Sequence, residues 1–239
     1  MQLDAGILAE FYRSSAGQIA RRAITARVTQ FWPHTKGLRL LGLGYAPPYL
    51  EQYRADSERV IAFMPAQTGV IAWPHDNPVT VLGDEQALPF ADSFFDRILV
   101  VHGLEGAEST RVLLRQLWRV LAPEGRLLIV APNRASLWAQ VVNSPFADGR
   151  PFHKGELARL LRGALLEPLR WERALYAPPF LTKHISSTGI GWEKFGRAIW
   201  KGVGGVHLVE ARKSLYGATA IPVKELKPDL VPVSLIPTQ

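Results

Sequence analysis

The sequence contains 239 residues, of which 47% are hydrophobic and 21% charged, with a formal net charge of +7, and this composition is typical of one globular domain with short extensions. It contains no cysteine, which excludes disulfide scaffolds, thiolate metal sites and cysteine nucleophiles. The apolar runs have strand length, far below the ~20 residues of a membrane span, and residues 1–20 lack the apolar block of a secretory signal, so we expect a cytoplasmic protein without a membrane span.

Residues 1–34 predict two amphipathic helices ahead of the main domain. Apolar side chains recur at helical spacing over residues 7–12 and again over residues 19–28. The segment is basic, because six Lys and Arg residues stand against two acidic residues in the stretch 1–39. A basic face attracts anionic ligands, acidic proteins or nucleic acid. Since the arginines are spread out, a solvated helix surface is the favoured interpretation, nucleic acid is a weaker alternative, and a protein partner at this segment stays open.

The middle of the sequence alternates strand-length apolar runs with helical stretches. A leucine-rich stretch over residues 113–121 predicts an amphipathic helix that Pro123 and Gly125 end. This alternation is typical of right-handed βαβ units, so the expected fold class is α/β, with a doubly wound, mostly parallel sheet. Strands are predicted at residues 38–43, 59–64, 79–82, 96–101 and 126–131.

The last third of the sequence is less regular. Helices are predicted over residues 154–165 and 192–201, and strands over residues 169–176 and 205–212. From residue 214 onward, four prolines forbid a long helix or a central strand. We therefore expect residues 214–239 to form an extended, proline-rich tail.

Two motifs follow predicted strands. The first strand runs into Gly42-Leu43-Gly44-Tyr45-Ala46-Pro47-Pro48, where missing side chains let a ligand approach the backbone, although a tight turn would need the same glycines. The second motif, Gly83-Asp84-Glu85-Gln86-Ala87-Leu88-Pro89-Phe90, lies between the third and fourth strands.

The second motif and the segment Arg119-Val120-Leu121-Ala122-Pro123-Glu124-Gly125 resemble class I S-adenosylmethionine-dependent methyltransferases, in particular the type 11 group. Residues 132–138 and 149–152 also resemble uncharacterised methyltransferase-like proteins of alphaproteobacteria. The resemblance implies a Rossmann-like, seven-stranded domain over residues 35–213. It also implies that the helical segment 1–34 is a lid over the acceptor pocket, with Tyr12 facing an acceptor that the basic rim would favour as anionic.

The resemblance also implies the residues that would hold S-adenosylmethionine. The glycine turn would meet the methionine moiety and the ribose, Asp84 would accept a hydrogen bond from the adenine amino group, and the backbone of Glu85 would meet the ring. At the end of the second strand, where the family carries an acid for the ribose hydroxyls, this sequence has Met64. The implied cofactor-binding positions are Gly42, Gly44, Ala46, Met64, Asp84 and Glu85.

His102 follows the fourth strand and is the candidate general base for an acceptor that must lose a proton, with a buried structural histidine as the alternative. The six histidines lack metal-ligand spacing, so no metal site is expected. The expected function is methyl transfer to an unidentified acceptor. Because the leading acid of the glycine motif and the ribose acid are both missing, the alternative is a catalytically silent methyltransferase-like binding or assembly protein.

Overall fold

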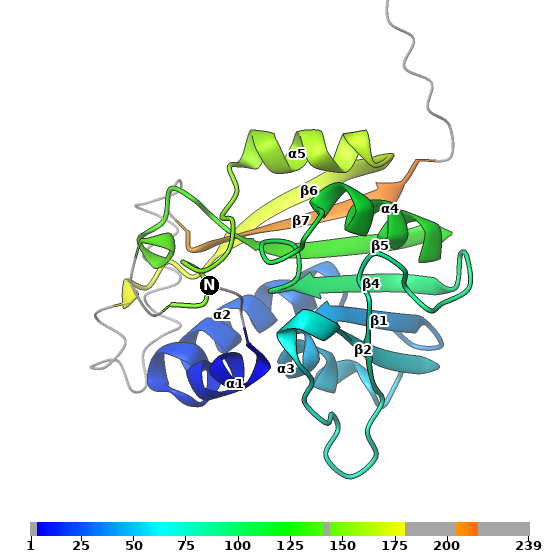
Figure 1. The fold of residues 1–239 in the computed structure, drawn as a ribbon, viewed down its shortest axis with the longest axis horizontal. Coiled ribbons are helices and arrows are strands. Elements are labelled where there is room, and N and C mark those ends of the chain that lie inside the picture. Colours follow the sequence, from blue (N-terminus) through cyan, green and yellow to red (C-terminus); the bar gives the residue numbers. More distant parts are fainter. Residues whose placement is uncertain (1–3, 141–143, 180–203, 215–239) are drawn as a thin grey trace, which may run out of the picture.

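The computed structural model describes residues 4–140, 144–179 and 204–214, and it contains one seven-stranded sheet in the order β3-β2-β1-β4-β5-β7-β6 (Figure 1). The first five strands run parallel, and β7 runs antiparallel to both β5 and β6. This topology confirms the predicted Rossmann-like, mostly parallel sheet. The strands are β1 (Arg39–Gly44), β2 (Arg59–Pro65), β3 (Thr80–Gly83), β4 (Phe95–Val101), β5 (Leu121–Pro132), β6 (Leu166–Ala174) and β7 (Val206–Lys213).

Helix boundaries follow local capping signals. Asp4 accepts the backbone N–H of Gly6, and Ser14 both ends the first helix and caps the second by accepting the N–H of Gly17. No helix in the described part of the chain is both long and apolar enough to cross a membrane. The helices are α1 (Ala5–Arg13), α2 (Ser15–Phe31), α3 (Pro47–Leu50), α4 (Thr110–Val120) and α5 (Lys154–Gly163).

Helices cover both faces of the sheet, and each strand therefore divides its side chains between two apolar cores. Leu99 packs with α1, α2 and α3 in one core, whereas its neighbour Val100 packs with α4 and α5 in the other. The same alternation separates Leu128 from Ile129 on β5. Burial on both faces explains why these strands are apolar almost throughout.

The strand β5 begins five residues earlier than its apolar run predicts. Leu121 has an extended backbone and pairs with Phe95, so the chain leaves α4 and enters the sheet before Pro123. A register irregularity between Phe95 and Arg97 accommodates the polar residues that follow. The predicted helix over residues 192–201 and the tail from residue 215 lie outside the described residues.

His207 is a buried histidine in the middle of the antiparallel part of the sheet. It lies on β7, is 3% exposed, and packs edge-on against Trp171 with 6.2 Å between ring centroids. Burial, followed by the nearby charges of Arg173 and Lys154, lowers the pKa of His207 to about 4. Since this value lies below the ~6.5 of an exposed histidine, the neutral ring stabilises the fold above pH ~6.5, and the contribution is lost as the pH falls toward 4.

Substitution His207→Gln should reduce the acid sensitivity of the fold, because glutamine does not titrate. Between pH ~6.5 and ~4 the free energy of unfolding of the wild type should fall by about 3 kcal/mol more than that of the variant. Urea unfolding at several pH values measures the difference, with the exposed His34→Gln as the matched control. An unchanged pH dependence in His207→Gln would contradict the assignment.

Candidate functional site

The turn after β1 is held against the end of β4. Gly44 has a φ of +76°, and a Cβ at this position would collide with the carbonyl oxygen of Val101 and lie 2.9 Å from the backbone nitrogen of Gly103. The N–H of the next residue, Tyr45, donates to the same carbonyl of Val101 at 2.7 Å. Glycine is therefore required at position 44 by both its backbone angle and its surroundings.

Gly42 has a different surrounding. A Cβ there would collide with the Cδ1 atom of Leu50 and lie 2.7 Å from the Cβ of Ala46. The missing side chain of Gly42 therefore gives α3 room to pack against β1. Ala46 is fully buried beside it, directly before the prolines that begin α3.

Met64 lies at the end of β2, where the resemblance places the acid for the ribose. Its side chain is fully buried in the core that contains α1 to α3. Its sulfur accepts the backbone N–H of Ile71 at 3.4 Å, so the connection from β2 to β3 folds back over it. At this position the ribose hydroxyls would therefore meet the thioether of Met64 and not the carboxylate that the family resemblance places there.

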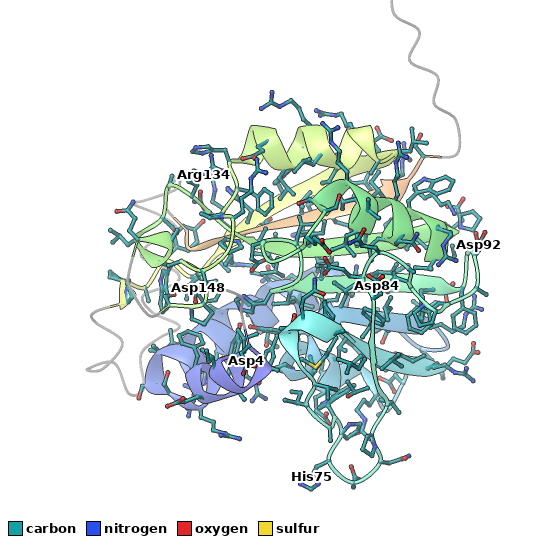
Figure 2. All side chains as sticks on the ribbon, in the orientation of Figure 1. Asp4, His75, Asp84, Asp92, Arg134 and Asp148 are labelled. Atoms are coloured by element: carbon teal, nitrogen blue, oxygen red, sulfur yellow. The ribbon has the colours of Figure 1, made fainter. Side chains whose placement is uncertain are left out.

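The connection after β3 begins with an exposed acid, Asp84, which Figure 2 labels, and a buried acid, Glu85. Exposed Asp84 uses Oδ1 to accept the N–H of Gln86 at 2.8 Å, which shapes a turn and leaves Oδ2 for a ligand. Glu85 is 1% exposed and accepts the N–H of Glu108 at 2.8 Å, and burial raises its pKa. The side chain of Glu85 thus ties this loop to the segment before α4.

Four buried polar side chains form a chain of hydrogen bonds beside the Gly44 turn. The hydroxyl of Tyr49 donates to the hydroxyl of Tyr12 at 2.8 Å, which leaves the hydrogen of Tyr12 for Nε2 of His102 at 2.9 Å. Nδ1 of His102 lies 3.1 Å from Oε1 of Glu105. This network assigns the His102 proton to Nδ1, which donates to Glu105. We call these four residues the Tyr–His–Glu relay.

Two features distinguish the relay from an ordinary buried network. His102 has a φ of +49°, a left-handed conformation that is uncommon for residues other than glycine and that clusters at functional sites. Oε2 of Glu105 is buried and has no hydrogen-bond partner among the described residues. A buried carboxylate oxygen without a partner is costly, so it marks a place where a ligand group can bind.

Aromatic rings surround the relay. The ring of Tyr12 stacks on Tyr45 with 5.3 Å between centroids and an interplanar angle of 7°. Phe146 lies 5.0 Å from the ring of His102 and 5.6 Å from that of Trp138. The site is therefore apolar except for the relay, which strengthens each of its hydrogen bonds.

The N-terminal helices contribute to this site unequally. Tyr12 on α1 reaches the relay, whereas Ile24 and Val28 on α2 are fully buried in the core on the sheet face. The arginines predicted at the rim, Arg13, Arg21 and Arg22, are exposed.

The residues present fit S-adenosylmethionine at several points, but two acids that the family resemblance implies are missing. The Gly44 turn brings backbone to the carboxyl edge of the sheet, Asp84 has a free oxygen, and the unpartnered Oε2 of Glu105 suits a cationic group. The ribose carboxylate is missing because Met64 stands in its place, and the leading acid of the glycine motif is missing as well.

Sequence reasoning missed Tyr49 and the role of Glu105. The spacing of His102 and Glu105, three residues apart after a strand, was a usable signal for a paired histidine and carboxylate. No sequence pattern connects Tyr49 with Tyr12, because they are 37 residues apart and meet only through packing of α1 against α3.

Residues 27–129 match the family model described as "Methyltransferase domain". A demethylmenaquinone methyltransferase from Corynebacterium efficiens is 39% identical over 64 residues, which are 27% of this chain and 28% of that protein. The chain therefore aligns with little more than a quarter of the length of this curated relative.

Solved structures share the fold over most of the chain. A structure described as a SAM-dependent methyltransferase from Thermotoga maritima has a TM-score of 0.61 at 15% identity, covering 86% of this chain and 94% of that one. The cyclase SpnF has a TM-score of 0.56 at 21% identity, covering 84% of each chain. Together these comparisons show that residues 27–129 are similar to a methyltransferase domain and that the chain shares the fold of the two solved structures.

Proposed function

We propose that the protein binds S-adenosylmethionine at the carboxyl edge of its sheet and transfers the methyl group to an unidentified acceptor. The observation that carries the proposal is the Tyr–His–Glu relay, which is buried directly beside the Gly44 turn. The relay is a buried series of hydrogen bonds at the edge of the sheet where ligands bind in α/β folds. Such a series can remove a proton from the acceptor during methyl transfer.

In the proposed mechanism the Gly44 turn, Asp84 and the backbone of Glu85 hold the cofactor, which supplies an electrophilic methyl group when bound. The chain's contribution is alignment and proton removal. Tyr12 accepts the acceptor's proton on its oxygen as its own proton passes to Nε2 of His102, and Glu105 stabilises the resulting imidazolium. Burial, followed by Tyr49, raises the pKa of Tyr12 well above its usual value, so the two transfers occur together and no standing phenolate forms.

The acceptor would reach the relay beneath α1, with residues 1–34 serving as the lid and Tyr12 facing the acceptor. Exposed arginines of this segment would attract an anionic acceptor or an acidic protein partner, an attraction that salt weakens. The soluble-type composition supports a cytoplasmic location within this proposal.

A second candidate function is a catalytically silent binding or assembly protein. Its supporting observation is Met64, whose burial leaves the ribose without a carboxylate. The similarity to SpnF, a protein described as a cyclase, illustrates that this fold carries other activities. Calorimetric titration with S-adenosylmethionine and S-adenosylhomocysteine separates the candidates, because the silent protein should bind neither ligand.

Asp84→Ala should weaken S-adenosylmethionine binding by roughly tenfold, because it removes the acceptor for the adenine amino group. The melting temperature should change little, since the side chain is exposed and supports only a local turn. Calorimetric titration measures the affinity, and Asp76→Ala, which removes another exposed loop aspartate, is the control. A destabilised Asp84→Ala protein with unchanged affinity would assign Asp84 to the turn alone.

Met64→Asp should tighten S-adenosylmethionine binding by roughly tenfold, because a charge-assisted hydrogen bond to the ribose is restored. The free variant should melt at a lower temperature, since the new carboxylate is buried until the ligand binds. Met64→Leu is the control for shape without charge, and its affinity should match the wild type. A folded Met64→Asp protein with wild-type affinity, or nanomolar binding by the wild type, contradicts this reading of position 64.

Tyr12→Phe should slow methyl transfer by about 100-fold or more while changing cofactor affinity little, because it removes the hydroxyl of the relay and keeps the ring on Tyr45. Transfer of labelled methyl from S-adenosylmethionine into a bacterial small-molecule extract gives the rate. Tyr53→Phe removes another buried hydroxyl, one bonded to the carbonyl of Trp32, and should leave the rate unchanged. Equal rates in both variants would remove the relay from the mechanism.

A further inference from the structure

A basic cleft lies between α4 and α5, on the sheet face opposite α1 to α3. The cleft is open to solvent on one side and has a volume of about 770 Å³, within the range of small-molecule sites. Helices α4 and α5 pack in one of the two apolar cores, whereas Tyr12 and the rest of the N-terminal segment pack in the other. The sheet therefore separates this cleft from the relay. Its lining residues are Ser109, Arg111, Val112, Arg115, Arg150, Glu156, Arg159, Leu160, Gly163 and Ala164.

The charges in the cleft are unbalanced. Glu156, its single acid, already pairs with Arg150 at 2.5 Å and with Arg134 at 3.0 Å. Arg134 belongs to the loop after β5, and Figure 2 shows it near the start of α5. The other three arginines, Arg111, Arg115 and Arg159, form no hydrogen bond or ion pair within residues 4–140, 144–179 and 204–214. Three exposed cations thus line one open cleft, and its single acid is already paired with other arginines.

Helix stability alone would disfavour this arrangement. Arg111 stands in the first turn of α4, where the helix dipole favours acids, and that turn contains no acid. Arg115 is four residues further on, so two like charges lie side by side on one helix face. Residues that oppose the stability of their own helix are a signal of function.

The backbone N–H groups at the start of α4 also favour an anionic ligand. Ser109 caps α4 by accepting the N–H of Val112 at 3.5 Å, and the first N–H groups of the helix have no partner within the helix. Such a terminus binds anions, and here it opens into the cleft lined by the arginines. Arginine is also the side chain best suited to phosphate oxygens.

We infer that the cleft between α4 and α5 binds a small molecule that carries two or more phosphate groups, at a site separate from the proposed cofactor site. Arg111, Arg115 and Arg159 bind the phosphates, with the α4 N-terminus as an additional donor. The apolar side chains of Val112 and Leu160 contact the rest of the ligand. A small molecule is favoured over nucleic acid because the cleft is limited in volume to about 770 Å³.

The test uses the whole protein and inorganic tripolyphosphate as the probe. The wild type should bind it at low salt in calorimetry and gain melting temperature on binding. Arg111→Gln/Arg115→Gln should weaken binding by roughly tenfold or more. Because this variant removes two repelling charges, it should fold and melt no lower than the wild type without ligand.

The matched control is Arg59→Gln/Arg162→Gln, which removes two exposed arginines outside the cleft, one of them on α5. This control has the same net charge as Arg111→Gln/Arg115→Gln and should retain the wild-type affinity for tripolyphosphate. No binding up to about 1 mM tripolyphosphate, or an equal loss in both double variants, would overturn the inference. Tighter binding of a random DNA duplex than of tripolyphosphate, with both variants weakened, would overturn it in favour of a nucleic-acid surface.

Discussion

The contact between the ends of β1 and β4 is the constraint on which the site depends. Gly44 fits only because it lacks a side chain against the Val101 carbonyl, and Tyr45 closes the turn by donating to that same oxygen. This contact sets where His102 leaves β4 and where α3 starts after β1. A larger residue at position 44 would separate the two strand ends and with them the partners of the relay.

The N-terminal helices complete the site that this contact organises. The hydroxyl of Tyr12 is the only link in the described structure between Tyr49 and His102, so the first helix is part of the relay as well as of the core. The hydrogen bonds of Tyr12 to Tyr49 and His102 lie among buried side chains, where a hydrogen bond is stronger than at a surface and costly to leave incomplete. The segment that carries Tyr12 is thus bound to the sheet edge by both packing and polar contacts.

Charge is distributed unevenly between the two sides of the sheet. The relay side carries buried tyrosines and one carboxylate with an unpartnered oxygen, which suits a cation. The side with α4 and α5 collects arginines in a cleft around a single acid that is already paired. The proposed phosphate-binding cleft therefore lies on the other side of the sheet from the core that contains Tyr12 and Tyr49.

The sequence by itself determined the sheet, its parallel order and the glycine turn, because apolar periodicity and backbone freedom are local properties. The family resemblance identified Met64 as a departure, Asp84 as a candidate for the adenine and Tyr12 as a candidate lid residue, and His102 was a candidate because it directly follows the fourth strand. Only the tertiary structure decided that Gly42 serves the packing of α3 and that Tyr49 and Glu105 join His102. It alone brought Arg159 opposite Arg111, because side chains from distant segments meet through helix packing, which no local pattern encodes.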